Sequence, residues 1–503
     1  MGFSNASRTL LAVLSGGFVL AGCAVGPDYV RPSIDVPAVF KESAGHPDAA
    51  DNGWKRASPQ VIDTRQPWWD AYQDAVLSGL MAQANAANQN IRQAEAQYRE
   101  ARAIADAARA NFWPTVGLDA GATRARALSS SGSTSGATTR LGTDYSAGLG
   151  ASWEPDVWGA VRRAVEAGDA DVQASADDLA GARLSIQTSV AQDYLQIRVI
   201  DLQRDLYAAT TAGYARSLAL TQHQYAAGVV LRSDVALAES QLKTAQAQAV
   251  DLEAQRAQLE HAIAVLTGQA PASFSLAALP AQTTPTPTTT TADAAPFHVQ
   301  LPSIPTGLPS ELLERRPDIA GAERRVQAAN AQIGVAKAAF FPQIVLNATG
   351  GFNSGSAAAL FNTPSRVWSL GATLAQTLFD GGLRRAHSDQ AIAAYDVAVA
   401  QYKQTVLGGF QQVEDNLATL RVLDDESRLQ ADAVTASQLA ERLALSQYRA
   451  GTATYLSVVT AQTLSLSNQR TAAQLLGRQL AASVALIAAT GGGWHAAEVT
   501  SGN

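Results

Sequence analysis

The sequence contains a single cysteine, Cys23, so one chain cannot form an internal disulfide. Its six histidines are widely spaced, and none lies three or four residues from another, as paired metal ligands on a helix do. A Gly-x-Ser-x-Gly nucleophile turn and a glycine-rich phosphate loop are also lacking. The acid-rich points, at residues 177–178 and 424–426, fall within helical stretches, which is typical of a solvated face. We therefore expect that the protein is not an enzyme, and we expect no cofactor and no metal ion.

The N-terminus has the features of an export signal. Arg8 supplies a positive charge, residues 9–20 form a short apolar stretch, and small residues precede Cys23. This pattern is typical of a bacterial lipoprotein signal, in which residues 1–22 are removed and Cys23 receives a covalent acyl or diacylglycerol lipid. The alternative is a plain secretory signal followed by an incidental cysteine. Because Ala24 follows, and not the aspartate that retains enteric lipoproteins in the inner membrane, we expect an anchor in the outer membrane.

After the signal, the sequence has no run of the about 18 consecutive apolar residues that a membrane-spanning helix needs. A mature chain that crosses a membrane would therefore do so with β-strands closed into a barrel. Acidic residues outnumber basic ones by 44 to 37, and the net charge of −7 argues against a nucleic-acid partner.

The chain contains an internal repeat with a period of about 225 residues. Its landmarks recur in the same order in both halves: Phe112-Trp113-Pro114 with Phe340-Phe341-Pro342, residues 159–163 with 381–385, and Tyr225 and Gly228 with Tyr448 and Gly451. Together with the export signal, the repeat divides the chain into five predicted parts. These are a signal peptide at 1–22, a first repeat at 23–268, a Thr/Pro-rich linker at 269–315, a second repeat at 316–491 and a C-terminal tail at 492–503.

Each repeat contains two runs in which apolar residues alternate with polar residues and glycines. The runs lie at residues 115–123, 144–153, 344–352 and 368–374. The first three are 9–10 residues long, the length of a tilted membrane strand, and the fourth is slightly shorter. One apolar face and one polar face are what lipid outside and water inside require. The segments 128–143 and 353–366 are then expected to be loops beyond the membrane. Two soluble hairpins are the alternative.

Four strands cannot close a barrel, for which about eight is the smallest common number. Three chains would supply twelve. The sequence therefore predicts an α+β membrane protein whose four strands per chain join a 12-stranded barrel in a homotrimer.

The rest of each repeat is predicted to be helix of unusual length. Residues 156–224 and 381–447 contain no proline, and at 1.5 Å per residue such helices would be about 100 Å long. Helices of this length pack laterally as coiled coils, here as a helical barrel or, alternatively, as an ordinary two-helix pair. Each ends at a glycine turn, near Gly228 or Gly451, and a second helix follows. Ser233 is expected, together with its neighbour Asp234, to cap the second helix of the first repeat.

Several motifs together carry a resemblance to a known family, and they lie at residues 23–29, Trp68-Trp69, 308–319, 322–323, 334–337 and 340–342. The sequence resembles the TolC-like outer-membrane efflux factors, in particular the lipidated, NodT/OprM-like branch that serves resistance-nodulation-division pumps. The resemblance implies a homotrimer with an equatorial domain, a periplasmic adaptor (membrane fusion) protein and an inner-membrane transporter of that type as partners.

The resemblance also implies roles for residues at the two helical turns, or tips. Leu456 matches an apolar constriction, so it is expected to be the pore gate. Thr460 stands where many members have an acidic residue, and this departure puts an electrostatic gate in doubt. The residues expected to contact the adaptor are Gly228, Ser233, Asp234 and Val235 on the first tip and Gly451, Tyr455 and Val458 on the second.

We therefore expect a passive exit duct in the bacterial outer membrane that extends into the periplasm and conducts substrates delivered by a transporter. The alternative is a lipid-anchored periplasmic coiled-coil scaffold without a pore. A scaffold would explain Cys23 and the helices, but it would not explain four amphipathic strands placed symmetrically in both repeats. The sequence does not identify the substrates.

Overall fold

The structure is a computed structural model, and it describes residues 24–37, 39–42, 67–129, 138–279, 301–302 and 312–493. The predicted signal peptide, Cys23, most of the Thr/Pro-rich linker and the C-terminal tail lie outside the described residues. The first repeat contains η1 (Trp68–Tyr72), α2 (Ala75–Ala87), α3 (Gln89–Ala110), β1 (Thr115–Ser129), β2 (Thr138–Trp153), α4 (Ala160–Ala226) and α5 (Arg232–Leu266). After η2 (Pro271–Ser273), the chain continues with α6 (Leu312–Arg315), α7 (Pro317–Ala338), β3 (Gln343–Ser354), η4 (Ala357–Ala359), η5 (Thr363–Ser365), β4 (Arg366–Ala375), α8 (Leu383–Arg449) and α9 (Tyr455–Ala489).

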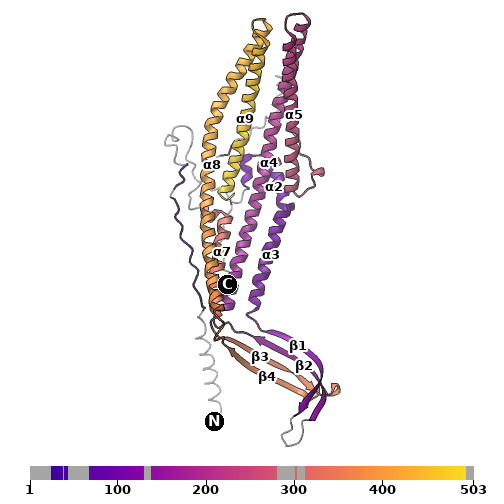
Figure 1. The fold of residues 1–503 in the computed structure, drawn as a ribbon, viewed down its shortest axis with the longest axis vertical. Coiled ribbons are helices and arrows are strands. Elements are labelled where there is room, and N and C mark those ends of the chain that lie inside the picture. The colour runs from indigo at the N-terminus through magenta and orange to yellow at the C-terminus, as the bar shows by residue number, and fades with distance from the viewer. Residues whose placement is uncertain are drawn as a thin grey trace. The chain divides into compact units, whose positions relative to one another are not determined.

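The element lengths confirm that the chain is a duplicated unit. Helices α3 and α7 each have 22 residues, α4 and α8 each have 67, and α5 and α9 each have 35. In both repeats the short helix is followed by two strands, the long helix and then the returning helix, which makes a long hairpin (Figure 1).

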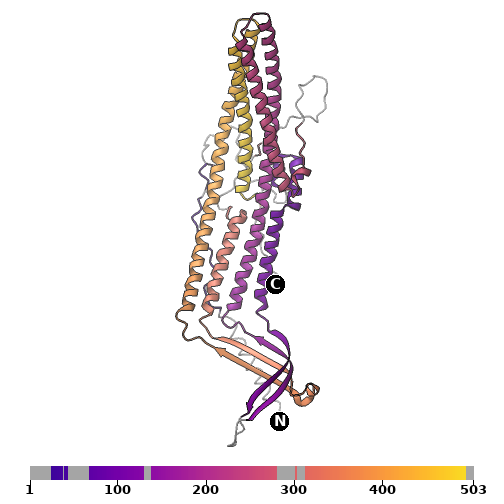
Figure 2. The same ribbon diagram turned by 45° about the vertical axis from the view of Figure 1, so that its right-hand side comes forward.

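The four strands form one antiparallel sheet in the order β1-β2-β3-β4 (Figure 2). Strands β3 and β4 have 12 and 10 residues, close to the expected length. The expected length was wrong for β1 and β2, which have 15 and 16 residues. Their backbone pairing continues to Ser129 opposite Thr138, so both ends of the segment predicted to be a loop at 128–143, residues 128–129 and 138–143, are strand. Continued pairing satisfies backbone groups that a loop would leave to solvent.

The chain divides into two compact units, and each unit draws on both repeats. One unit contains the whole sheet with residues 97–176 and 321–402, and the other contains the two helical tips. The long helices continue through both units. The limits of the sequence repeats at 23–268 and 316–491 remain a prediction.

The core of the unit that contains the tips gathers where η1, α2 and α3 pack against α4 and α9. Among the described residues, α9 is the one helix long and apolar enough to meet a length-and-hydropathy test for a membrane span, with a mean hydropathy of 1.3. More than half of that window is buried inside the protein, so core packing accounts for its composition. The buried residues of this core include Trp68, Tyr72, Leu77, Met81, Ile91, Val190, Tyr194, Ile197, Leu480 and Val484.

Candidate functional site

The sheet has one apolar face, because the register aligns the apolar positions of all four strands. Side chains directly opposite in neighbouring strands lie on the same face. One row across the sheet consists of Val116, Ala151, Ala348 and Leu370, and the next consists of Leu118, Leu149, Gly350 and Trp368.

The large side chains of these rows are exposed in the single chain: Val116, Leu118, Leu149, Trp368 and Leu370. A soluble protein rarely exposes so many apolar side chains side by side, whereas a membrane strand presents them to lipid. The expected alternation of the two faces is therefore confirmed by the register.

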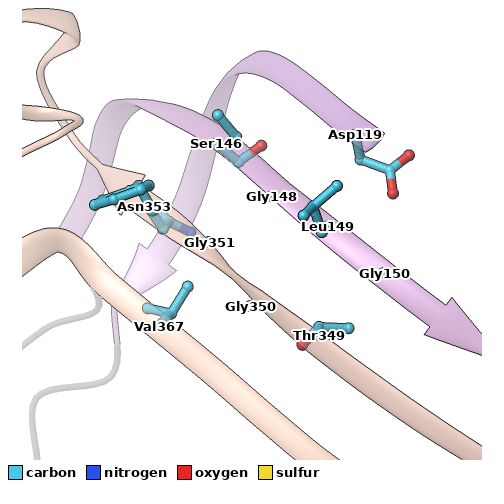
Figure 3. A pocket seen from close by; sticks show the side chains of 12 residues that line it. Asp119, Ser146, Gly148, Leu149, Gly150, Thr349, Gly350, Gly351, Asn353 and Val367 are labelled. Atoms are coloured by element: carbon cyan, nitrogen blue, oxygen red, sulfur yellow. The ribbon is translucent and has the colours of Figure 1, made fainter. Parts of the chain in front are cut away.

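The opposite face of the sheet is polar and rich in glycine. Asp119 is in one row with Gly148 and Gly351, and the neighbouring row pairs Thr349 with Ser369, whose hydroxyl oxygens lie 2.7 Å apart. Figure 3 shows Asp119, Ser146 and Thr349 beside Gly148, Gly150, Gly350 and Gly351, and together these residues line a shallow hollow. Such a face suits water better than a closed ligand site.

Gly351 is required by a close approach of two strands. A Cβ atom at this position would lie 2.4 Å from the carbonyl oxygen of Ala147 and 2.5 Å from the Cα of Gly148. The backbones of β2 and β3 can therefore keep this spacing only without a side chain there.

Each long helix begins at an acidic cap. Both carboxylate oxygens of Asp156 accept hydrogen bonds, from the backbone N–H groups of Val161 and Arg162, and the Arg162 side chain donates to the same group. Asp380 does the same for Gly382 and Arg384, and the bond from Arg384 holds the pKa of the Asp380 carboxyl below its usual value. The two helices thus leave the sheet in equivalent ways.

The two tips turn at glycines with positive φ, as expected. Gly228 has φ +74° and Gly451 has φ +73°. In each turn the glycine N–H donates to a carbonyl three residues back, Tyr225 or Tyr448, and the next N–H donates to a carbonyl five residues back. This pattern closes a helix C-terminus and needs the left-handed conformation at the glycine.

The start of α5 differs from the prediction. The N-cap residue is Leu231, and Ser233 lies inside the first turn, so the expectation that Ser233 caps the helix was wrong. Asp234 does cap it, because its carboxylate accepts the backbone N–H of Leu231 at 3.3 Å. An acid three residues into a helix is favoured there by the exposed N–H groups. Val235 is half-buried beside it.

A cluster of buried residues joins the two hairpins near their ends, and we call it the tip cluster: Ala238, Tyr448, Tyr455 and Val458. The rings of Tyr448 and Tyr455 lie 5.3 Å apart, and the hydroxyl of Tyr448 lies 3.3 Å from that of Thr221 on α4. Burial raises the pKa of Tyr455 to about 12, so it stays neutral. Sequence reasoning missed Tyr448 and Thr221, because a helix-end tyrosine gives no local sign of its partner on another helix.

The residues assigned to the tips therefore divide into two groups. Tyr455 and Val458 are buried inside the tip cluster, whereas Gly228, Ser233 and Gly451 are exposed. Leu456 is 61% exposed although it adjoins buried Tyr455, so it is available to meet another surface. The hydroxyl of Thr460 donates to the carbonyl of Leu456 at 2.9 Å, within the same helix.

The residues that follow Cys23 are docked against the unit that contains the sheet. Val25 donates its backbone N–H to the carbonyl of Trp158, and the guanidinium of Arg163 donates to the carboxylate of Asp28 at 2.9 Å. Gly26 has φ +112°, and a Cβ there would lie 2.5 Å from the Cα of Gly334. These contacts fix the position from which the chain leads back to Cys23. Among the described residues, no group of His, Cys, Asp or Glu could hold a metal ion.

Comparison with known proteins gives the same result along nearly the whole chain. The family model described as outer membrane efflux protein matches residues 80–269 and 308–492. The pyoverdine export outer membrane protein OpmQ of Pseudomonas aeruginosa is 31% identical over 490 residues, covering 96% of this chain and 97% of the relative. The toluene efflux pump outer membrane protein TtgF of Pseudomonas putida is 31% identical over 476 residues, covering 94% and 95%. The solved outer-membrane channel OprN superposes with a TM-score of 0.83 at 29% identity, covering 94% of this chain and 100% of that one.

The fold, the two-faced sheet and these matches agree. The protein is an outer-membrane channel component of an efflux system, it is not an enzyme, and it needs no cofactor. The chain belongs to the outer membrane efflux protein family.

Proposed function

We propose that three copies of the chain form one exit duct, anchored in the outer membrane by a lipid on Cys23 and closed at its helical tips. In this proposal a periplasmic adaptor docks at the tips, and an inner-membrane transporter of the resistance-nodulation-division type supplies the energy. The duct itself is passive: it provides a water-filled path to the exterior.

One observation supports the proposal of a trimer: the four-stranded sheet has an apolar face but is open at both edges. Strands β1 and β4 each pair on one side only, and unpaired edges are not tolerated in lipid, where no water can satisfy their backbone groups. Pairing β4 of one copy with β1 of the next removes every edge, and three copies reach the strand number of a barrel with an interior wide enough for a channel.

The exposure of Leu456 supports its role as the gate. In a trimer, three copies of this leucine would converge where the hairpins end, and apolar side chains close a pore by packing and by excluding water. Thr460 bonds within its own helix and provides no charged ring. An apolar gate is therefore better supported than an electrostatic one.

The relatives suggest that the cargo is decided elsewhere. OpmQ is named for pyoverdine export and TtgF for toluene efflux, yet both are 31% identical to this chain. A duct that lines its path with glycine and small polar residues selects little. In this proposal, the transporter determines what is exported.

The proposal is tested with the full-length, processed protein in detergent and in planar bilayers. Expected are heat-sensitive trimers on denaturing gels and single-channel conductance. Monomeric, non-conducting protein would contradict the duct and favour the scaffold. Mass spectrometry of the N-terminal peptide tests whether Cys23 carries the lipid.

The gate is tested separately with Leu456→Ser, which should raise the closed-state conductance. The matched control is Leu464→Ser, which changes another exposed leucine of α9 eight residues further along. Equal closed-state conductance in the two variants would refute the gate assignment. Gly228→Val and Gly451→Val should impair adaptor cross-linking more than membrane insertion, because a side chain at positive φ costs about 1–2 kcal/mol; normal cross-linking in both would count against the tips as docking sites.

A further inference from the structure

The two repeats build the same junction between helix and strand. The backbone N–H of Phe112 donates to the carbonyl of Arg109, and the N–H of Phe340 donates to that of Lys337. The carbonyl of Phe112 accepts the indole N–H of Trp153 at 3.0 Å, and the carbonyl of Phe340 accepts the amide of Gln376 at 3.0 Å. Phe112 therefore corresponds to Phe340, and Trp153 to Gln376.

Within one chain, the linker after β2 covers the junction of the second repeat. Trp158 stacks on Phe341 with the ring centroids 4.8 Å apart, and its indole N–H donates to the carbonyl of Pro342 at 2.7 Å. This contact exists because β2 pairs with β3, which brings the end of β2 beside the start of β3.

The corresponding linker after β4 has no junction to cover among the residues that the structure describes. Leu378 and Phe379 are 91% and 88% exposed. The junction of the first repeat is exposed in turn, because Trp113 is 74% exposed before the start of the other edge strand, β1. The exposed linker after β4 thus lies at one edge of the sheet. The exposed junction between α3 and β1 lies at the other edge.

We propose that Leu378 and Phe379 of one copy pack against Trp113 of the next copy, as Trp158 packs against Phe341 inside the chain. This inference rests on the trimer proposed above and names the residues at its interface. The interface between copies then repeats the contact between the halves of one chain, with the phenylalanine on the linker and the tryptophan on the junction.

The repeat also sets the register of the strands between copies. Leu149 lies four residues before Trp153 and faces Gly350, which lies ten residues after Phe340. At the edges of the sheet, the residue four positions before Gln376 is Ala372, and the residue ten positions after Phe112 is Ala122. Strand β4 therefore pairs with β1 of the next copy so that Ala372 faces Ala122. Both positions belong to the apolar face, so the lipid-facing surface continues across the interface.

Charge complementarity supports the same docking. Arg162 and Arg384 both bond the acidic cap of their helix, so Arg163 corresponds to Arg385. Inside the chain Arg163 lies against Gly334, six residues before Phe340. Asp106, which already pairs with Arg109 of its own helix at 2.8 Å, is six residues before Phe112, so it faces Arg385 of the neighbouring copy. An acid stands opposite an arginine where the contact within the chain has a glycine.

Cysteine cross-linking tests the interface in the assembled protein. Ala122→Cys with Ala372→Cys, and Trp113→Cys with Phe379→Cys, should give a ladder of covalent dimers and trimers on non-reducing denaturing gels after oxidation with copper phenanthroline. Leu149→Cys with Gly350→Cys is the matched control, since these facing residues lie in one chain and cross-link without changing its mass. The single variants control for Cys23. Ala120→Cys with Ala372→Cys, displaced by two residues, should cross-link at least tenfold less.

The outcomes separate the two proposals. Heat-stable, conducting trimers without a ladder from either test pair would overturn the interface and leave the duct intact; the exposed linker would then face bilayer lipid. A stronger ladder from the displaced pair would refute the register. If the unmodified protein forms no trimer, the duct itself fails.

A charge exchange provides a second readout for variants that assemble poorly. Asp106→Arg and Arg385→Asp should each lower the temperature at which the trimer dissociates, and the double variant should recover most of the loss. A double variant no more stable than the singles would contradict the pairing.

Discussion

The tip cluster predicts that a single hydroxyl group helps hold the two hairpins of one chain together. Tyr448→Phe keeps the ring beside Tyr455 and removes only the bond to Thr221. The hydroxyl of Thr221 also donates to the carbonyl of Ser217 at 2.9 Å, so it keeps a partner in the variant. The loss is therefore that of one long, neutral hydrogen bond, about 0.5–1 kcal/mol, without an added penalty for an unsatisfied group.

This free energy corresponds to about a two- to fivefold rise in local opening at the tip. Tyr448→Ala also removes the buried ring, and a truncation of that size costs about 3–5 kcal/mol in a packed site. The two variants therefore separate the hydroxyl from the ring. The matched control is Tyr225→Phe at the corresponding position of the first repeat, because Tyr225 is 46% exposed whereas Tyr448 is 4% exposed.

Native-state hydrogen exchange of peptides covering the ends of α8 and α9 measures the effect. Exchange should rise two- to fivefold in Tyr448→Phe, much further in Tyr448→Ala, and not at all in Tyr225→Phe. If the tip is the closed end of the duct, the closed-state conductance should follow the same order. Equal exchange in Tyr448→Phe and Tyr225→Phe would refute the role of the hydroxyl, and equal exchange in Tyr448→Ala and the wild type would refute the cluster.

Three further predictions follow from other parts of the chain. Gly351→Ala should lower the thermal stability of the sheet by about 1–3 kcal/mol, because its Cβ would meet backbone at 2.4 Å; Gly371→Ala, which meets nothing within 4 Å, should be neutral in the same melting experiment. Burial raises the pKa of Asp193 from 3.8 to about 6, so its ionisation opposes folding, and stability should fall as the pH rises from about 4 to about 6. Asp193→Asn should abolish that fall and add about 1–2 kcal/mol at pH 8, after allowance for solvent screening; melting curves without a difference between pH 5 and pH 8 in the wild type would contradict it. Arg163→Ala should release the segment after Cys23 and make its limited proteolysis several-fold faster, and an unchanged cleavage rate would show that the other contacts suffice.

The sequence predicted the elements that depend on local periodicity. The proline-free stretches 156–224 and 381–447 correspond closely to α4 and α8, because a helix of this length is determined by its own residues and by the glycines at its end. The alternating faces of the strands were also correct, since a period of two leaves no choice of face. The predicted ends of β1 and β2 were wrong. Backbone pairing between two strands continues as long as each supplies the other with hydrogen-bond partners, whatever the side chains are.

What the sequence could not supply were the contacts between elements. The cap of α5 depends on where the chain leaves the turn, and this places Leu231 at the N-cap position and Ser233 inside the first turn. The partners of Tyr448 and Trp158 lie on other elements, more than 180 residues away in the chain. Such pairs depend on how elements far apart in the chain pack against one another, which local propensity does not encode.

Because the chain is duplicated, its two halves can be compared, and the comparison provides information on contacts that the sequence alone does not give. Where both halves meet the same surroundings, they keep the same bonds, as at the carbonyls of Phe112 and Phe340. Where the linker after β2 meets the other half and the linker after β4 is left at an edge of the sheet, the two linkers diverge: Trp158 in the first is packed, while Phe379 in the second is exposed. Divergence between corresponding linkers of one chain thus separates contacts made within it from surfaces left for a neighbour. In a duplicated chain whose sheet is open at both edges, the second repeat therefore serves as the internal reference from which the interface between copies can be derived.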